Sequence, residues 1–235
     1  NELTVAENVY NDVYKVKVKR FIKEVKSQKD IPVTTLINSK YIHSSIKNKI
    51  YKDAKYLVTY NLKLQGTQIE INTLFLSEKD FKNLNKFEKT IDNVFIFLKF
   101  MFFYLKRKKP KQMKYYLFLT NNRKVLPKSK DEVIGSLNCN TGITYGCSLE
   151  GEVLIYRKEE CFKVILHETI HLLCLDFNNL HLEKINQKIK NLLHINSNIN
   201  LFESYTEYWA NIFHSIFCAK NLSVNYKKDF LLYLD

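Results

Sequence analysis

The 235-residue sequence contains few of the residues that interrupt regular structure, with only 5 Gly and 3 Pro. This scarcity excludes a collagen-like, linker-rich or disordered chain, because each of those classes depends on a high content of one or both residues. The hydrophobic fraction of 46% is ordinary for a globular protein. The composition therefore predicts one compact unit with a sizeable core.

The sequence also lacks the ~20 consecutive apolar residues that a membrane-spanning helix requires. Residues 94–105 come near to this pattern, since they are apolar except for Lys99 and are followed by a basic run and Pro110. The segment is too short to span, so we expect a buried helix and no transmembrane span. Contact of this helix with a membrane interface is the alternative.

Paired cysteine motifs are absent, and the five cysteines form an odd number. The first residues show no signal-peptide pattern. Both features predict a cytoplasmic protein with reduced, mostly buried thiols rather than a disulfide framework. The cysteines are Cys139, Cys147, Cys161, Cys174 and Cys218.

Acidic residues are the minority, with 24 Asp and Glu against 37 Lys and Arg, for a formal net charge of +13. The excess is nearly all lysine and is spread along the chain, which favours a solvated surface. Binding to nucleic acid or to another anionic surface is the alternative, but no arginine cluster or binding motif supports it.

The hydrophobic pattern predicts an α+β fold. The helix-like spacing of Val5, Val9, Val13 and Val16 predicts a helix within residues 2–26. Alternation predicts two strands joined at Gly66, and Ser77 has the place of a helix N-cap. The remaining predicted elements are an apolar helix at 90–107, strands at 114–120, 142–147 and 151–156, and helices at 158–175, 181–194 and 201–220.

A soft boundary near Pro110 would separate an N-terminal α+β region of unknown role, residues 1–110, from a catalytic region, residues 111–235. We expect the two regions to form one compact unit.

The strongest chemical signal is the sequence His-Glu-Thr-Ile-His at residues 167–171. Residues four apart lie on one face of a helix, so His167 and His171 can reach one ion, and neutral imidazole is a preferred zinc ligand. Glu168 lies beside them and can act as a general base on a water molecule. Because the flanks are apolar, burying these side chains without a partner would be costly, which favours a metal over unliganded histidines.

A catalytic zinc ion usually takes three protein ligands, so a third is needed. Asp176 and His181 lie close downstream, but Glu203 is the best candidate, because it lies on an otherwise apolar helix. Glu207 shares its face and would accept a hydrogen bond from a ligand histidine, or would itself be the ligand.

The motif HETIH, followed by a helix bearing Glu-x-x-x-Glu, resembles the gluzincin, or thermolysin-like, zinc metallopeptidases. The resemblance implies a zincin-like fold, in which a small mixed sheet packs on the active-site helix and on a second ligand-bearing helix. It implies that Glu203 is the third metal ligand and that Glu207 holds the first histidine by a hydrogen bond, with residues 175–200 as an insertion or an extra helix. The stretch YRKEECFKVILHETIH, with ESYTEYWA downstream, also looks like uncharacterised metallopeptidases of giant DNA viruses, which implies the host cytoplasm or the virion as the location.

The sequence thus predicts a zinc metallopeptidase that acts on a peptide or protein substrate. An oxyanion stabiliser is needed as well, and Tyr145, Tyr205, Tyr208 and His214 are candidates. Two alternatives are a structural or virion-associated protein that keeps the fold without turnover, and a basic nucleic-acid-associated protein.

Overall fold

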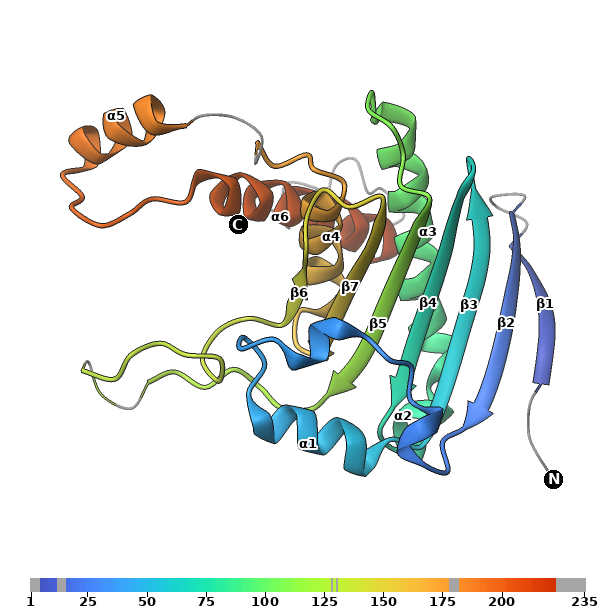
Figure 1. Cartoon of the computed structure of the whole chain (residues 1–235). Helices are drawn as coiled ribbons and strands as arrows, with labels where there is room; N and C mark the ends of the chain where they lie inside the picture. Colours follow the sequence, from blue (N-terminus) through green and yellow to red (C-terminus); the bar gives the residue numbers. More distant parts are fainter. Residues whose placement is uncertain (1–4, 12–15, 128, 130, 178–181, 223–235) are drawn as a thin grey trace.

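A seven-stranded mixed sheet forms the centre of the protein in the computed structural model, which describes residues 5–11, 16–127, 129, 131–177 and 182–222 (Figure 1). The strand order is β1-β2-β3-β4-β5-β7-β6. The strands are β1 (Val5–Asn11), β2 (Val16–Glu24), β3 (Tyr56–Leu64), β4 (Thr67–Phe75), β5 (Gln112–Thr120), β6 (Gly142–Thr144) and β7 (Glu150–Arg157). This architecture confirms the predicted α+β class.

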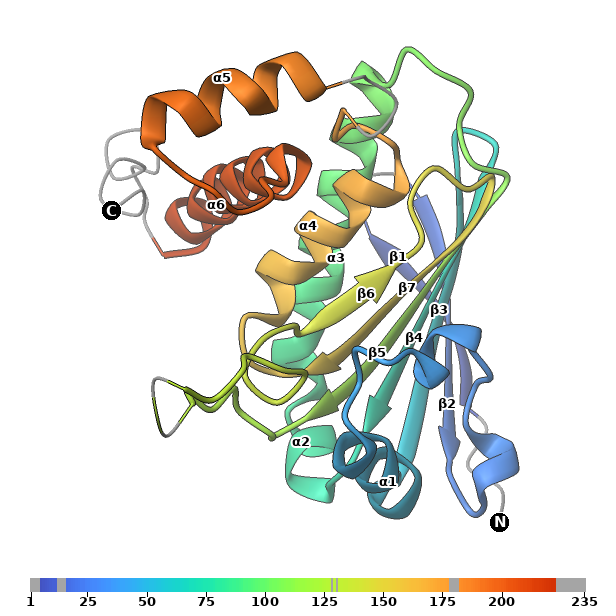
Figure 2. The ribbon, with the colours of Figure 1, turned by 60° about the vertical axis from the view of Figure 1, so that its left-hand side comes forward.

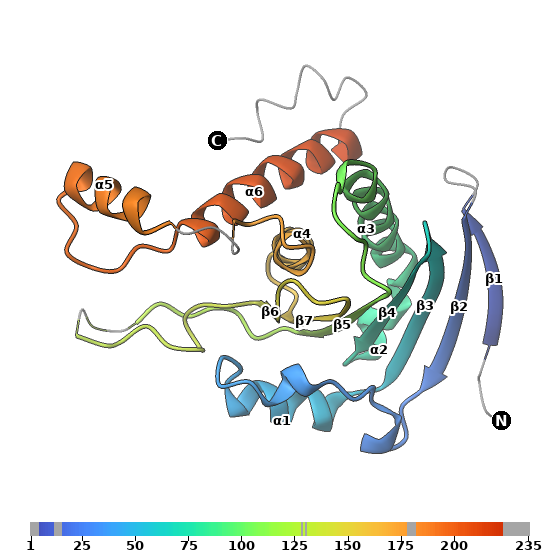
Figure 3. The same ribbon diagram turned by 45° about the horizontal axis from the view of Figure 1, so that its top comes forward.

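Helices cover both faces of the sheet (Figure 3). On one face lie α3 (Leu84–Tyr104), α4 (Cys161–Leu172) and, outside α4, α6 (Leu201–Leu222). The opposite face is covered by α1 (Ser44–Asp53) and the short 3-10 helix η2 (Thr35–Asn38), whose apolar residues pack on β4, β5 and β7. The other short elements are the 3-10 helix η1 (Gln28–Asp30), α2 (Glu78–Lys82) and α5 (Glu183–Leu193).

The predicted N-terminal helix is wrong, because β1 and β2 pair as antiparallel strands there, with Val9 opposite Val18. A step of four residues, as from Val5 to Val9, fits one face of a strand as well as one face of a helix, whereas the step of three from Val13 to Val16 fits a helix only. Val13 lies outside the described residues. The high β-propensity of valine favours the strand. Pairing of β2 with β3 joins this hairpin to the main sheet.

The predicted hairpin at Gly66 is confirmed by the antiparallel strands β3 and β4. Gln65 has φ 48° and Gly66 has φ 93°, as a two-residue turn between twisted strands requires. Next along the sheet, β4 pairs in parallel with β5, so Ile69 lies opposite Met113. The sheet therefore runs without a break across the region of Pro110.

The predicted apolar helix is α3, and it is buried on one face only. The Ser77 hydroxyl accepts a hydrogen bond from the Asp80 amide at the start of α2, as expected of an N-cap, and α3 follows. Its core side chains include Val94, Phe97, Leu98, Met101 and Phe102, whereas Phe100, Phe103 and Tyr104 are exposed. Within the described residues, no helix combines the length and apolarity needed to cross a membrane.

Two glycines allow α4 to lie close against the sheet. A Cβ added at Gly151 would lie 2.0 Å from Leu172 Cδ1, and one at Gly142 would lie 2.8 Å from Val164 Cγ1. The expected insertion between α4 and α6 contains α5, which stands apart from the sheet (Figure 2). His181, one of the possible ligands, is outside the described residues.

The expectation that all cysteines are reduced thiols is contradicted by a disulfide between Cys147 and Cys174. It links the turn after β6 to the residues after α4, with the two Cα atoms 4.6 Å apart. The sequence did not predict this pairing, because the two cysteines are 27 residues apart and meet only through the packing of β6 and α4. The other three cysteines are free.

Candidate metal centre

His167 and His171 lie one helical turn apart on α4, on the side that faces α6. Their Nε2 atoms are 3.0 Å apart, and the ring planes are inclined at 67°. Both imidazoles are largely buried, with 15% and 12% of the side chain exposed. The i, i+4 spacing therefore brings the two rings to one point, as the sequence predicts.

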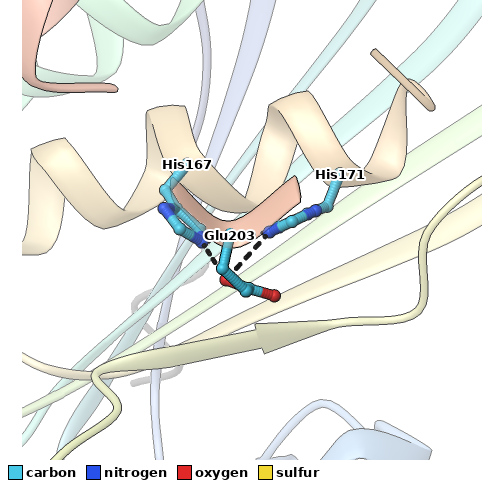
Figure 4. A group of neighbouring side chains, drawn as sticks. All are labelled: His167, His171 and Glu203. Atoms are coloured by element: carbon cyan, nitrogen blue, oxygen red, sulfur yellow. Dashed lines mark hydrogen bonds and ion pairs between the residues drawn. The ribbon is translucent and has the colours of Figure 1, made fainter. Parts of the chain in front are cut away.

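Glu203, in the first turn of α6, brings a carboxylate to both rings (Figure 4). Its Oε2 atom is 3.3 Å from Nε2 of His167 and 3.4 Å from Nε2 of His171. Close approach of the two helices is possible because Ala210, on α6, is small and fully buried.

The spacing of these three atoms fits a tetrahedral metal. Two ligands that are each ~2.0–2.1 Å from a zinc ion at the tetrahedral angle lie ~3.3 Å from one another. The observed separations of 3.0, 3.3 and 3.4 Å are close to this value. Among the described residues, His167, His171 and Glu203 thus form a group that could hold a metal ion.

Each histidine is also held through its other ring nitrogen. Oε2 of Glu207 lies 3.0 Å from Nδ1 of His167, and Lys163 donates a hydrogen bond of 2.7 Å to Oε1 of the same carboxylate. Oδ2 of Asp176 lies 2.5 Å from Nδ1 of His171. A carboxylate on Nδ1 directs Nε2 toward the metal position and makes it a better ligand.

Asp176 was considered as a possible metal ligand, but the structure places it against the ring of His171 instead. It lies behind His171, away from Nε2, and is almost fully buried. The chain reaches this point through Cys174, which has φ 57° without being glycine. A carboxylate five residues after the second histidine was the available signal, but sequence alone did not show that the chain would fold back.

The carboxylates around His167 and His171 favour a positive charge between them. Hydrogen bonds from the two imidazoles hold the pKa of Glu203 far below its usual range. Burial alone lowers the pKa of His171, but hydrogen bonds to Asp176 and Glu203 outweigh it and raise the pKa to about 10. In the absence of a metal, a proton on His171 therefore supplies the positive charge that these carboxylates favour.

Glu168 lies on the inner side of α4 and is 9% exposed. Burial raises the pKa of Glu168 to about 7, against the opposing effect of the two histidines, and the backbone N–H of Thr144 donates a hydrogen bond to it. Glu168, both histidines and Glu203 line one cavity, which has a volume of about 430 Å³. A carboxyl group with a pKa near neutrality can both accept and release a proton.

None of the four residues considered as oxyanion stabilisers lines this cavity. Tyr145 and Tyr208 are exposed, Tyr205 packs on Phe177, and His214 lies near Cys218, with Nε2 3.7 Å from its sulfur. The polar residues that do line it include Tyr41 and Asn140.

Tyr41 belongs to the N-terminal region whose role the sequence left open. It follows η2, and its backbone carbonyl accepts a hydrogen bond of 3.2 Å from the Tyr156 hydroxyl. No sequence pattern connects it with the histidine motif, because it lies more than a hundred residues earlier.

Comparison with known proteins gives no relative for this chain: no family model, no curated protein and no solved structure matches it.

Proposed function

We propose that the protein is a zinc-dependent peptidase whose metal is held by His167, His171 and Glu203. The observation that carries the proposal is the near-tetrahedral spacing of these three ligand atoms next to a buried carboxyl group, Glu168. A site that only stabilises the fold usually closes the coordination with four protein ligands, whereas three leave a position for water or substrate. When bound there, zinc would supply a Lewis acid that polarises the scissile carbonyl and lowers the pKa of water toward ~7.

Glu168 acts as the general base in this proposal. Its carboxylate takes a proton from the attacking water and then delivers that proton to the leaving nitrogen. Burial favours both steps, because the raised pKa of about 7 keeps the accepted proton transferable at neutral pH. Tyr41 and Asn140, which also line the cavity, are the candidates for stabilising the developing negative charge.

A peptide substrate is favoured by the position of β6. This strand is at the edge of the sheet in the described residues, and Gly142, Ile143 and Thr144 line the cavity. An extended peptide can add to such an edge through main-chain hydrogen bonds, which hold it whatever its side chains are. The zincin-like character of the fold is part of the proposal, and it rests on this edge strand, on α4 and on α6.

The test compares bound zinc and peptide-library cleavage in the wild type, Glu168→Gln and Glu203→Gln. Glu168→Gln should keep one zinc per chain and lose ~10²–10⁴-fold in rate, since it removes the base but no ligand. Glu203→Gln should lose zinc affinity, because a neutral amide replaces an anionic ligand. Glu78→Gln, an exposed carboxylate on α2, is the matched control and should change neither property.

Equal cleavage by the wild type and Glu168→Gln would show that the activity comes from another site. A wild-type protein that holds zinc firmly but cleaves nothing would favour the alternative of a zincin-like structural protein without turnover.

A further inference from the structure

Three aromatic side chains are exposed at the C-terminal end of α3. Phe103 is 76% exposed, Tyr104 63% and Phe100 44%. They contact one another, with ring centroids 4.8 Å apart for Phe100 and Tyr104 and 5.0 Å apart for Phe103 and Tyr104. Single exposed apolar residues are common, but a contiguous exposed group typically marks an interaction site.

The group continues onto α6. The ring of Phe100 lies 5.6 Å from that of Phe213, and Phe213 lies 5.8 Å from Trp209; these two α6 residues are half-buried and pack on the core. These five residues from two helices are called the aromatic ridge below. The contact between Phe100 and Phe213 connects the two helices, so the ridge crosses from α3 to α6.

A cationic loop follows α3 directly. Lys106, Arg107 and Lys108 are exposed, and Lys109 donates a hydrogen bond of 2.5 Å to Gln65 in the β3–β4 turn. The loop is tied at its far end, where the Lys111 amide donates to the carbonyl of Leu149 at 2.7 Å. These five cations, from Lys106 to Lys111 with Pro110 between them, are called the basic loop below.

The C-terminal end of α3 and the basic loop that follows it lie at the same end of the molecule, at the top of Figures 1 and 2. Glu150 is an acidic residue at this end, next to Leu149, so the five cations leave a clear positive excess. Apolar rings beside lysines suit a boundary where apolar chains meet negative headgroups, because Trp, Tyr and Phe bury their rings there while lysines stay at the surface.

We propose that this end of the protein docks on an anionic lipid membrane. The exposed rings of the aromatic ridge, Phe100, Phe103 and Tyr104, enter the boundary between headgroups and acyl chains, and the basic loop contacts the anionic headgroups. Single-stranded nucleic acid also binds rings and cations, but it needs rings placed along a charged groove. Here the exposed rings crowd at one helix end and the cations follow in a separate loop, which suits a planar partner.

The proposal predicts how much of the membrane affinity comes from charge and how much from apolar contact. Each lysine or arginine near an anionic surface strengthens partition about fivefold, so neutralising three should weaken it about 100-fold. Raising the salt from about 0.1 M to about 1 M should weaken it similarly, since the screening length falls from about 10 Å to about 3 Å. Removing the exposed rings should weaken binding at every salt concentration.

The experiment is flotation of the full chain with vesicles of phosphatidylcholine, with or without phosphatidylserine. We expect binding only when phosphatidylserine is present, and its loss in Lys106→Gln/Arg107→Gln/Lys108→Gln and in Phe103→Ser/Tyr104→Ser. The matched control is Lys26→Gln/Lys29→Gln/Lys52→Gln, which removes the same charge from exposed sites after β2 and on α1, at the opposite end of the molecule. This control should bind like the wild type.

Three results would overturn the proposal. The first is the absence of flotation with phosphatidylserine vesicles, including the case in which the same variants abolish binding to single-stranded DNA instead. The second is equal weakening by the control triple variant, which would indicate net charge alone. The third is loss of a dimer, rather than of vesicle binding, in Phe103→Ser/Tyr104→Ser, which would make the ridge a contact between two copies of this chain. None of these measurements depends on zinc or on peptide cleavage.

Discussion

His171 should carry a proton at neutral pH in the metal-free protein and lose it when zinc binds. The hydrogen bonds to Asp176 and Glu203 raise its pKa to about 10 despite burial. At pH 7 the protonated ring is therefore favoured by about three pH units, or about 4 kcal/mol. Because zinc binds the neutral ring, proton competition at this residue should weaken zinc binding at pH 7 roughly 1000-fold.

The assay is nitrogen NMR of the histidine rings across a pH titration of the metal-free protein. His171 should keep the spectrum of a charged ring to about pH 9, and zinc at about pH 8 should convert it to the neutral tautomer with its proton on Nδ1. Asp176→Asn keeps a hydrogen-bond acceptor but removes the charge, so the midpoint should fall by about 1 pH unit or more. A wild-type midpoint near the ordinary value of ~6.5 would refute the reasoning.

The same titration sets the pH dependence of the metal-free fold. Because the pKa of His171 is about 10 in the folded chain and about 6.5 in the unfolded chain, its stabilising effect is complete below pH 6.5 and disappears as the pH rises to 10. The raised pKa of Glu168, about 7 against 4.5, also costs stability as the pH rises, but between pH 4.5 and 7. Unfolding free energies measured with a chelator should therefore fall toward alkaline pH. A rise between pH 6.5 and 10 would contradict this assignment.

Three further changes test how the fold supports the site, each measured as the free energy of unfolding. Cys147→Ser should cost roughly 2–4 kcal/mol, because the disulfide closes a loop of 27 residues, and a reductant should then have no further effect on the variant; an unchanged midpoint would indicate that the bond does not form. Gly142→Ala should cost about 1–3 kcal/mol, since its Cβ would lie 2.6 Å from Ile155 Cδ1. The control Gly135→Ala should leave the free energy of unfolding nearly unchanged, because its Cβ would have no neighbour closer than 3.8 Å. Arg157→Lys should cost about 3 kcal/mol or more, because the fully buried guanidinium donates to four backbone carbonyls that a lysine cannot all reach. A loss below about 1 kcal/mol would contradict a stabilising role for these hydrogen bonds.

The parts of the site that the sequence could predict are those fixed by local geometry. The spacing of His167 and His171 determines a shared helix face whatever the rest of the chain does. Glu203 and Glu207 could be chosen because a carboxylate pair on an apolar helix needs a cation nearby. The structure brings both to the histidines, Glu203 at Nε2 and Glu207 at Nδ1.

What the sequence could not predict depends on packing between distant segments. Asp176 reaches His171 only because the chain turns back after α4, and Tyr41 reaches the cavity only because the segment after η2 lies beside β7. The disulfide of Cys147 also needs that packing. The strands β1 and β2 were predicted as a helix for a different reason, since a spacing of four residues, as from Val5 to Val9, does not distinguish the two structures.

Diffraction at the zinc absorption edge from crystals of the zinc-loaded protein tests the central claim most directly. The account predicts one anomalous peak per chain, ~2.0–2.2 Å from Nε2 of His167, Nε2 of His171 and a carboxylate oxygen of Glu203, with Glu168 near the ion but not bonded to it. A peak at other residues, or a Glu203 carboxylate turned away from the ion, would contradict it.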